Sequence, residues 1–254
     1  LEVICMARIL GISGKKQSGK NTTANYIHGN ILKELNLARD FYIEEDTGTL
    51  VIETRDSTGR YGWGEFDVCR KDISFVQYAE REIWPYVKMY SFADGLKNLC
   101  VEFFGLKPDQ VYGTDERKNE KIPHLLWENM PSDKNKKGPM TAREFMQFFG
   151  TDIMRSMHGT VHVDHAISRI KAEGSALSII ADVRFPNEVK SIQEAGGKVI
   201  RLTRQTSDDC HASECGLDKE NFDWSNFDAV VENDKPLNEC LTMYDEVYNN
   251  LFLR

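Results

Sequence analysis

The sequence lacks any run of about 18 consecutive apolar residues, the length that a helix needs to cross a bilayer. Its first residues, LEVICMARILGIS, also lack the long apolar stretch and the small-residue cleavage site of a secretory signal peptide. We therefore expect a cytoplasmic protein with no membrane partner. Met6 is the expected natural start, and residues 1–5 are expected to be a remnant of expression or of upstream read-through.

Cysteine pairs of the C-x-x-C type are absent, although the chain contains 6 cysteines. Such scattered cysteines are ordinary in a reducing compartment. The group Cys210, His211 and Cys215 could contribute to a zinc site. Partners at metal spacing for a further ligand are missing, however, so we favour the interpretation that these residues bind no zinc.

An excess of positive charge is absent too. The chain has 32 Lys and Arg against 40 Asp and Glu, a formal net charge of -8. Proteins that coat nucleic acid need a basic face that releases counterions, so no nucleic-acid partner is expected. A few local arginines can still bind a small anionic substrate, because a guanidinium group can grip a phosphate through two hydrogen bonds.

The sequence does contain an alternation of short apolar runs and helical patterns. The apolar runs predict buried parallel strands at 7–13, 87–92, 177–181, 199–203 and 229–232. Helices are predicted at 21–35, 94–104, 141–150, 188–195 and 236–251. Strands that alternate with helices predict an α/β fold, with a parallel sheet covered by helices on both faces.

Two segments interrupt this alternation. Residues 41–66 show period-two patterning and two glycine turns, which predicts an antiparallel excursion; the alternative is a solvated loop with little strand content. Residues 107–138 are polar and lysine-rich, which is typical of a lid or of a segment on the substrate side. We expect one domain over residues 6–254 that carries both insertions.

A glycine-rich motif, GKKQSGKNT at 14–22, lies between the first predicted strand and the first predicted helix. In such a loop, glycines let backbone N–H groups turn toward a phosphate, and the helix N-terminus adds partial positive charge. Lys20 is placed to reach the β- and γ-phosphates of a nucleotide. The residue after this lysine is normally Ser or Thr, but here it is Asn21, a weaker oxygen ligand for Mg²⁺, followed by Thr22. The alternative is a glycine turn with a solvated lysine pair.

Asp182 is a second candidate site residue, because it directly follows the predicted strand at 177–181. An Asp after a strand is most often a turn or helix-cap residue. In a protein with a phosphate loop, such an Asp lies beside the first strand and binds Mg²⁺ directly or through water. The combination favours a role in metal binding or phosphoryl transfer.

Several sequence blocks together resemble the deoxynucleoside monophosphate kinases of tailed bacteriophages. These blocks are GKKQSGKNTT (14–23), PYVKMYSFADGLK (85–97), MTAREFMQFFGTDIMR (140–155), ADVRFPNEV (181–189) and HASE (211–214). The resemblance implies the P-loop nucleoside monophosphate kinase fold, a three-layer sandwich around a five-stranded parallel sheet. It also implies transfer of the ATP γ-phosphoryl group to a deoxynucleoside monophosphate with Mg²⁺, for phage DNA precursors, in the host cytoplasm.

The resemblance also implies roles for individual residues. ATP would be bound by Gly14, Lys16, Ser18, Gly19, Lys20, Asn21 and Thr22. Arg204 is a candidate second clamp on the ATP phosphates; the alternative is an exposed charge at the end of a strand. The monophosphate would be bound by Arg143, Gln147, Gly150, Thr151, His162, Arg184 and Glu188. The catalytic set would be Lys20, Arg143, Asp182 and Arg184, and the metal ligands would be Asn21 and Asp182. Asp182 and Glu188 could each bind Mg²⁺, bind the deoxyribose 3′-hydroxyl or pair with an arginine, and the sequence does not assign among these roles. Without the motifs, Arg143–Glu144 and Arg184–Glu188 would be ordinary solvated helix pairs.

Two departures from the family pattern leave alternatives open. Asn21 replaces an acidic residue, and His162 replaces a tryptophan that can stack on a base. The histidines His158, His162 and His165 could form a metal cluster, but a surface helix with incidental histidines is favoured. The rival functions are a kinase for another small acceptor, such as dephospho-coenzyme A, and a nucleotide-binding protein without turnover. Small-molecule nucleotides are the expected partners, and a homodimer is possible.

Overall fold

The computed structural model describes residues 8–55, 58–68, 70, 72–131, 135–204 and 215–252. The chain divides into two compact units, residues 1–91 with 167–254 and residues 92–166. The described part of each unit has its own hydrophobic core. Among the described residues, no helix is long and apolar enough to cross a membrane. The expectation of one domain over residues 6–254 stays a prediction.

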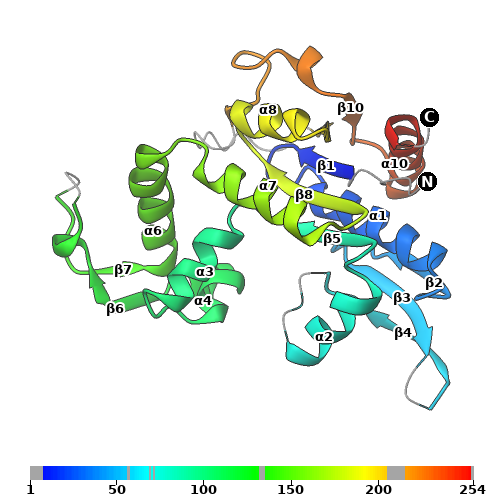
Figure 1. The fold of residues 1–254 in the computed structure, drawn as a ribbon, viewed down its shortest axis with the longest axis horizontal. Coiled ribbons are helices and arrows are strands. Elements are labelled where there is room, and N and C mark those ends of the chain that lie inside the picture. The colour runs from blue at the N-terminus through cyan, green and yellow to red at the C-terminus, as the bar shows by residue number, and fades with distance from the viewer. Residues whose placement is uncertain are drawn as a thin grey trace. The chain divides into compact units, whose positions relative to one another are not determined.

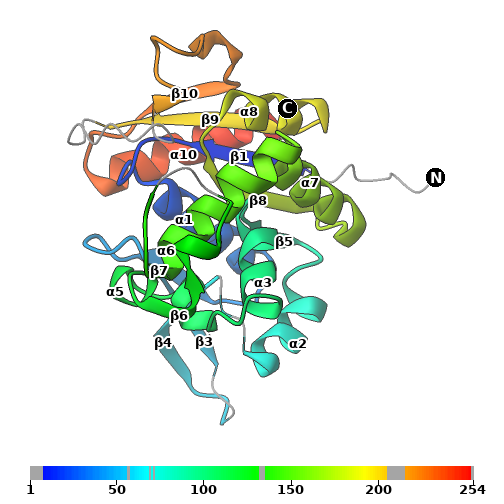
Figure 2. The ribbon, with the colours of Figure 1, turned by 90° about the vertical axis from the view of Figure 1, so that its left-hand side faces the viewer.

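The first unit is built on a five-stranded parallel sheet (Figure 1). Its strand order is β10-β9-β1-β8-β5, and Figure 2 shows β9, β1 and β8 side by side. The bounds are β1 Arg8–Ser13, β5 Val87–Tyr90, β8 Leu177–Val183, β9 Lys198–Thr203 and β10 Ala229–Glu232. All five predicted strands are confirmed, as is the α/β class.

Helices cover both faces of this sheet, as alternate residues of β1 show. Leu10 and Ile12 belong to a core cluster that includes residues of α1 (Lys20–Glu34) and α10 (Leu237–Phe252). Gly11 lies between them and faces α8 (Pro186–Glu194), since a Cβ on Gly11 would lie 2.7 Å from Ile192 Cδ1. Successive side chains of a strand point to opposite faces, so α8 and the α1–α10 pair form the outer layers of a sandwich.

The predicted antiparallel excursion is confirmed. Strands β2 (Asp40–Ile43), β3 (Leu50–Arg55) and β4 (Tyr61–Glu65) pair in the order β2-β3-β4. Leu50 and Ile52 are buried in the same core cluster as α1, whereas all of β4 is exposed. Helix α2 (Ile73–Glu82) follows the excursion; its N-cap Asp72 accepts a hydrogen bond from the backbone N–H of Phe75.

The second unit contains short elements around an aromatic core. Their bounds are α3 Asp94–Glu102, α4 Pro108–Tyr112, α5 Asp115–Lys118, β6 Lys121–Leu126, η1 Trp127–Asn129, β7 Pro139–Thr141, α6 Ala142–Gln147 and η2 Phe148–Arg155. Helix α7 (Val161–Glu173) begins in this unit. The predicted capping box between Thr141 and Glu144 is confirmed at the start of α6.

The described part of the polar insertion at 107–138 is folded into this unit. Val111, Ile122 and Trp127 are buried in its core, beside Phe145 of α6. The apolar residues that anchor the insertion are few, which is why its overall composition predicts a polar loop. Its role as a lid stays a prediction.

One buried side chain of α1 makes the first unit sensitive to acid. His28 is 2% exposed, and its two ring nitrogens have no hydrogen-bond partner among the described residues. Burial lowers the pKa of His28 to about 3, because desolvation disfavours the imidazolium form. The unfolded chain, with a histidine pKa of about 6.5, therefore binds a proton that the folded chain rejects, so stability falls as the pH drops below that value.

We expect His28→Leu to reduce this acid sensitivity. Between about pH 7 and about pH 5, the His28 contribution lowers the free energy of unfolding by about 2 kcal/mol, by linkage from the two pKa values. Urea unfolding at both pH values measures this loss in each protein. The exposed His165, changed to Leu, is the matched control. Equal acid losses in His28→Leu and in the unmodified chain would contradict the prediction.

Candidate active site

The carboxyl edge of the main sheet brings the candidate residues of the first unit together. β1 is followed along the sheet by β8 and then β5 on one side, and by β9 on the other, so the strand order reverses beside β1. In open α/β sheets, ligands bind outside the carboxyl ends of the strands at such a switch point. The phosphate-loop motif leaves β1 at this position, and Asp182 lies near the same end of β8.

The phosphate loop is tightly packed. A Cβ on Gly14 would lie 2.2 Å from Ser18 Oγ, and a Cβ on Gly19 would lie 2.4 Å from Asn233 Nδ2. Gly19 has a φ of 89°, which a side chain would also disfavour. A side chain at either position would therefore collide with the side chain of Ser18 or of Asn233, which pack directly on the loop backbone.

Lys20 is the first residue of α1, and its side chain reaches back over the loop. Its Nζ donates hydrogen bonds to the backbone oxygens of Gly14, at 2.7 Å, and of Lys15, at 2.6 Å. Ser18 Oγ is buried and has no hydrogen-bond partner among the described residues. A cationic amine, a buried hydroxyl and a helix N-terminus at one loop fit the oxygens of a nucleotide's phosphates.

The next two residues of α1 differ in their surroundings. Asn21 is exposed and lines a cavity of about 530 Å³. Thr22 lies against the turn between β2 and β3, since a Cβ on Gly48 would lie 2.3 Å from Thr22 Oγ1. Asn25 holds this turn in place by donating a hydrogen bond of 2.9 Å to the Gly48 backbone oxygen. The excursion thus contacts the helix that carries the phosphate loop; the phosphate-binding roles of Asn21 and Thr22, like that of the exposed Lys16, stay predictions.

Asp182 lies beside Ser91, a residue of the block at 85–97 to which the sequence analysis gives no role. Ser91, directly after β5, donates a hydrogen bond of 2.6 Å from its Oγ to Asp182 Oδ2. β5 and β8 are neighbours in the sheet, so a polar residue near the carboxyl end of each strand was the signal available in the sequence. Mg²⁺ prefers oxygen ligands and is commonly bound by one or two carboxylates together with substrate phosphates, so the donor set at Asp182 fits it.

Groups of three or more His, Cys, Asp or Glu side chains that could bind a metal are absent from the described residues. Of the candidate zinc group, Cys210 and His211 lie outside those residues, as does the rest of the HASE block, and Cys215 is half-buried. His158 is exposed and lies 2.7 Å from Asp164, between Nε2 and Oδ2. His158 and His165 are exposed, as a surface helix predicts, whereas His162 is buried. That these histidines bind no metal stays a prediction.

The chain after β8 is fixed by Glu188. This carboxylate is 1% exposed, and its Oε2 accepts hydrogen bonds from the backbone N–H of Arg184, at 2.7 Å, and of Phe185, at 3.0 Å. The alternative of a solvated helix pair is wrong for Glu188, because the side chain is buried. Glu188 thus orients the backbone that carries the exposed Arg184, and direct contact of either residue with substrate stays a prediction.

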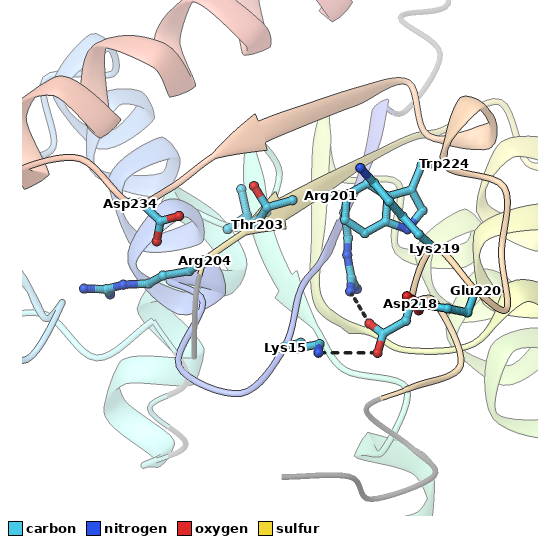
Figure 3. A pocket seen from close by; sticks show the side chains of 10 residues that line it. Lys15, Arg201, Thr203, Arg204, Asp218, Lys219, Glu220, Trp224 and Asp234 are labelled. Carbon is cyan, nitrogen blue, oxygen red and sulfur yellow. Dashed lines mark hydrogen bonds and ion pairs between the residues drawn. The ribbon is translucent and has the colours of Figure 1, made fainter. Parts of the chain in front are cut away.

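A pocket of about 280 Å³ lies beside the phosphate loop (Figure 3). Asp218 joins its two sides: Oδ1 lies 3.1 Å from Arg201 Nη2, and Oδ2 lies 3.4 Å from Lys15 Nζ. Arg201 is 4% exposed and also donates a 2.9 Å hydrogen bond to Ser13 Oγ, at the end of β1. This network ties the segment after residue 215 to the sheet and to the phosphate loop.

The other end of the pocket holds Arg204, the arginine expected to contact ATP. Figure 3 shows the extended Arg204 side chain near the side chain of Asp234. Thr203 lies between these two residues and Arg201, which stacks on Trp224. The exposed guanidinium leaves β9 at the carboxyl edge, as a phosphate clamp requires. Sequence reasoning missed the Asp218 network, because its members are separated by up to 205 positions and share no motif.

The second unit holds most residues expected to bind the monophosphate. Arg143 and Gln147 lie on α6, one turn apart, so their side chains share a face. Arg143 Nη2 lies 2.6 Å from Asp115 Oδ1 in an exposed ion pair. Gln147 and Thr151 are exposed, whereas Gly150 is buried: a Cβ there would lie 2.5 Å from Leu96 Cδ2.

His162 is packed inside this unit. It is 8% exposed, and its Nε2 lies 3.0 Å from the Gly150 backbone oxygen. Burial lowers the pKa of His162, partly offset by this hydrogen bond, so the neutral ring is favoured. The observed contact ties His162 to the backbone of η2 at Gly150. Base stacking by His162 stays a prediction, and little of the residue is exposed for it.

The sandwich, the strand order and the glycine loop define a P-loop kinase-like protein. A sequence model of the family described as "Deoxynucleotide monophosphate kinase" matches residues 88–243. A protein of Acanthamoeba polyphaga mimivirus, described as "Putative deoxynucleotide monophosphate kinase", is 32% identical over 163 residues, which cover 59% of this chain and 76% of that protein. The chain belongs to the deoxynucleotide monophosphate kinase family and is an enzyme that phosphorylates a nucleotide.

Proposed function

We propose that this protein transfers the γ-phosphoryl group of ATP to a deoxynucleoside 5′-monophosphate, giving ADP and the deoxynucleoside diphosphate. The observation that carries the proposal is the phosphate loop at the switch point of the sheet, with Lys20 over its backbone. Membership of the family supports the acceptor class. The proposal includes a cytoplasmic location and a supply of precursors for phage DNA, as the resemblance to bacteriophage enzymes implies.

In this proposal the loop binds the phosphates of ATP. The backbone N–H groups near Gly19 and the amine of Lys20 neutralise the β- and γ-phosphates as negative charge moves toward the β-phosphate oxygens. Arg204 would bind the same phosphates from the end of β9. A Mg²⁺ ion, when bound, would supply positive charge that neutralises the phosphates. Asp182 and Asn21 would hold it.

The acceptor monophosphate is proposed to bind through Arg143, with Gln147, Gly150 and Thr151 of the same unit. Arg184 is proposed, from the resemblance, as a further phosphate-binding cation. Arginine suits this role because its planar guanidinium can donate two parallel hydrogen bonds to one phosphate. Gln147 can read a base edge, since its amide both donates and accepts. No covalent intermediate is needed, because positioning and charge neutralisation supply most of the catalysis of phosphoryl transfer. The proposed partners are nucleotides, without nucleic acid or a membrane.

A coupled ADP-release assay with ATP and Mg²⁺ tests the proposal. The acceptors are dAMP, dGMP, dCMP, dTMP and 5-hydroxymethyl-dCMP, each alone, beside the ribonucleotides and dephospho-coenzyme A. ADP release that depends on a deoxynucleotide is the expected result and identifies the accepted base. Release only with dephospho-coenzyme A would assign the rival kinase activity. ATP binding without release for any acceptor would support a nucleotide-binding protein and overturn the proposal.

A further inference from the structure

Asn233 connects the last strand of the sheet to the phosphate loop. It follows β10 directly and is 6% exposed. Its side-chain Nδ2 donates a hydrogen bond of 2.7 Å to the backbone oxygen of Ser18, and its backbone N–H donates one of 2.7 Å to the Thr203 oxygen. One residue thus joins the loop after β1 to the ends of β9 and β10.

The orientation of this amide is fixed by Tyr244 of α10. The Tyr244 hydroxyl donates a hydrogen bond to Asn233 Oδ1, so the Nδ2 group faces Ser18. Burial raises the pKa of Tyr244 to about 12, and the phenol therefore stays protonated and able to donate. Tyr244 is 2% exposed, so water does not compete freely for the amide oxygen.

The hydrogen bond to Ser18 determines where the next N–H group points. The peptide between Ser18 and Gly19 is trans, so its C=O and N–H point in opposite directions. Since the Ser18 oxygen points toward Asn233, the Gly19 N–H points away from Asn233. Asn233 Nδ2 also lies 2.4 Å from the position of a Gly19 Cβ, so the amide packs directly on the backbone of Gly19.

We propose that Asn233 is a positioning residue of the phosphate loop, which sets the Ser18–Gly19 peptide so that the Gly19 N–H donates to a phosphate of ATP. Tyr244 does not contact the Ser18–Gly19 peptide through this network but fixes the orientation of the Asn233 amide. This inference rests on the proposed function, because it assigns ATP to the loop. It adds two residues from the end of the chain, which the loop motif does not include.

Asn233→Asp tests this role with little change of shape. The ionised carboxylate presents an oxygen to the Ser18 oxygen in place of a donor, so the peptide loses its hydrogen bond and meets repulsion. We expect the Kd for ATP, measured by calorimetry at about pH 8, to rise at least tenfold, about 1.4 kcal/mol. The KM for the acceptor is expected to change less than about twofold, because the lost hydrogen bond to the Ser18 oxygen positions only the loop that binds ATP.

The pH profile distinguishes positioning from a general structural defect. A buried carboxyl has a raised pKa, so the new Asp is protonated as the pH falls toward about 6. Its O–H group can then donate to Ser18, and the ATP affinity of Asn233→Asp is expected to recover, unlike that of the unmodified chain. Asn226→Asp is the charge-matched control, because Asn226 is exposed and precedes the amino end of β10.

Tyr244→Phe supplies a second test if Asn233→Asp does not fold. It removes the hydroxyl that fixes the amide, and ATP binding is expected to weaken about threefold, within the usual worth of one hydrogen bond. ATP affinity unchanged in either folded variant would overturn the inference. An unmodified chain that binds ATP but phosphorylates no deoxynucleotide would overturn the proposed function alone, and one that binds no ATP would overturn both.

Discussion

Lys20→Ala is expected to abolish phosphoryl transfer while leaving the chain folded. The Lys20 amine lies over the loop, bonded to the backbone oxygens of Gly14 and Lys15, and contributes nothing to the hydrophobic core. Removal of one group that stabilises charge in a transition state costs on the order of 10²–10³-fold in kcat. We expect a loss of at least this size in kcat/KM for ATP, measured by ADP release with a saturating acceptor.

The matched control is Lys33→Ala, near the end of the same helix. Lys33 is exposed, and its Nζ lies 2.7 Å from Asp40 Oδ1 in a surface ion pair that contributes little to stability. This variant is expected to keep full activity. Circular dichroism and thermal unfolding establish that both variants are folded. Activity of folded Lys20→Ala within about threefold of the unmodified enzyme would refute the phosphate-loop assignment. A threefold loss is far smaller than the loss in rate expected when a group that stabilises the transition state is removed.

Arg143→Ala is expected to weaken the acceptor monophosphate far more than ATP. A charge-assisted hydrogen bond is worth about 1.5–3 kcal/mol, and a guanidinium makes two such bonds to a phosphate, so the KM for the acceptor should rise on the order of 10²-fold. The KM for ATP should change little. Steady-state kinetics with each substrate varied in turn measures the two values. A loss confined to ATP would show that the two binding sites had been exchanged.

Two further variants separate phosphate binding from the ion pair seen in the structure. Asp115→Ala removes the carboxylate 2.6 Å from Arg143 but keeps the guanidinium. Because exposed pairs contribute little to stability, we expect this variant to bind the acceptor at least as well as the unmodified enzyme. Arg143→Lys keeps the charge and loses the planar pair of donors, so an intermediate KM is expected. A loss in Asp115→Ala equal to that in Arg143→Ala would point to a structural role for the pair.

The local elements could be predicted because their signals are local. Buried parallel strands appear as short apolar runs, and helices as apolar residues at a spacing of three or four. The glycine loop carries its own signature, because Gly14 and Gly19 stand where a Cβ would collide with a neighbour. The insertion at 107–138 was harder to read, since a few buried residues such as Trp127 decide its packing against many polar neighbours.

The residues of the candidate site also fall into those that local motifs predict and those that depend on tertiary contacts. Lys20, Arg143 and Asp182 were identified from motifs in which the chemistry lies within a few residues. His162 and Glu188 were identified too, but the structure shows both buried and bonded to the backbone, which a motif does not reveal. Ser91 was missed, because its link to Asp182 depends on β5 being the neighbour of β8.

By itself, the sequence determined the class of fold, the five strands, the antiparallel excursion and the phosphate loop, because each depends on residue types at short spacing. Only the tertiary structure decided the strand order, the Asp218 network with Lys15 and Arg201, and the contact of Asn233 with Ser18. Those contacts join residues that are distant in the chain. They form because parallel strands bring their carboxyl ends to one edge of the sheet, an arrangement that no local pattern specifies.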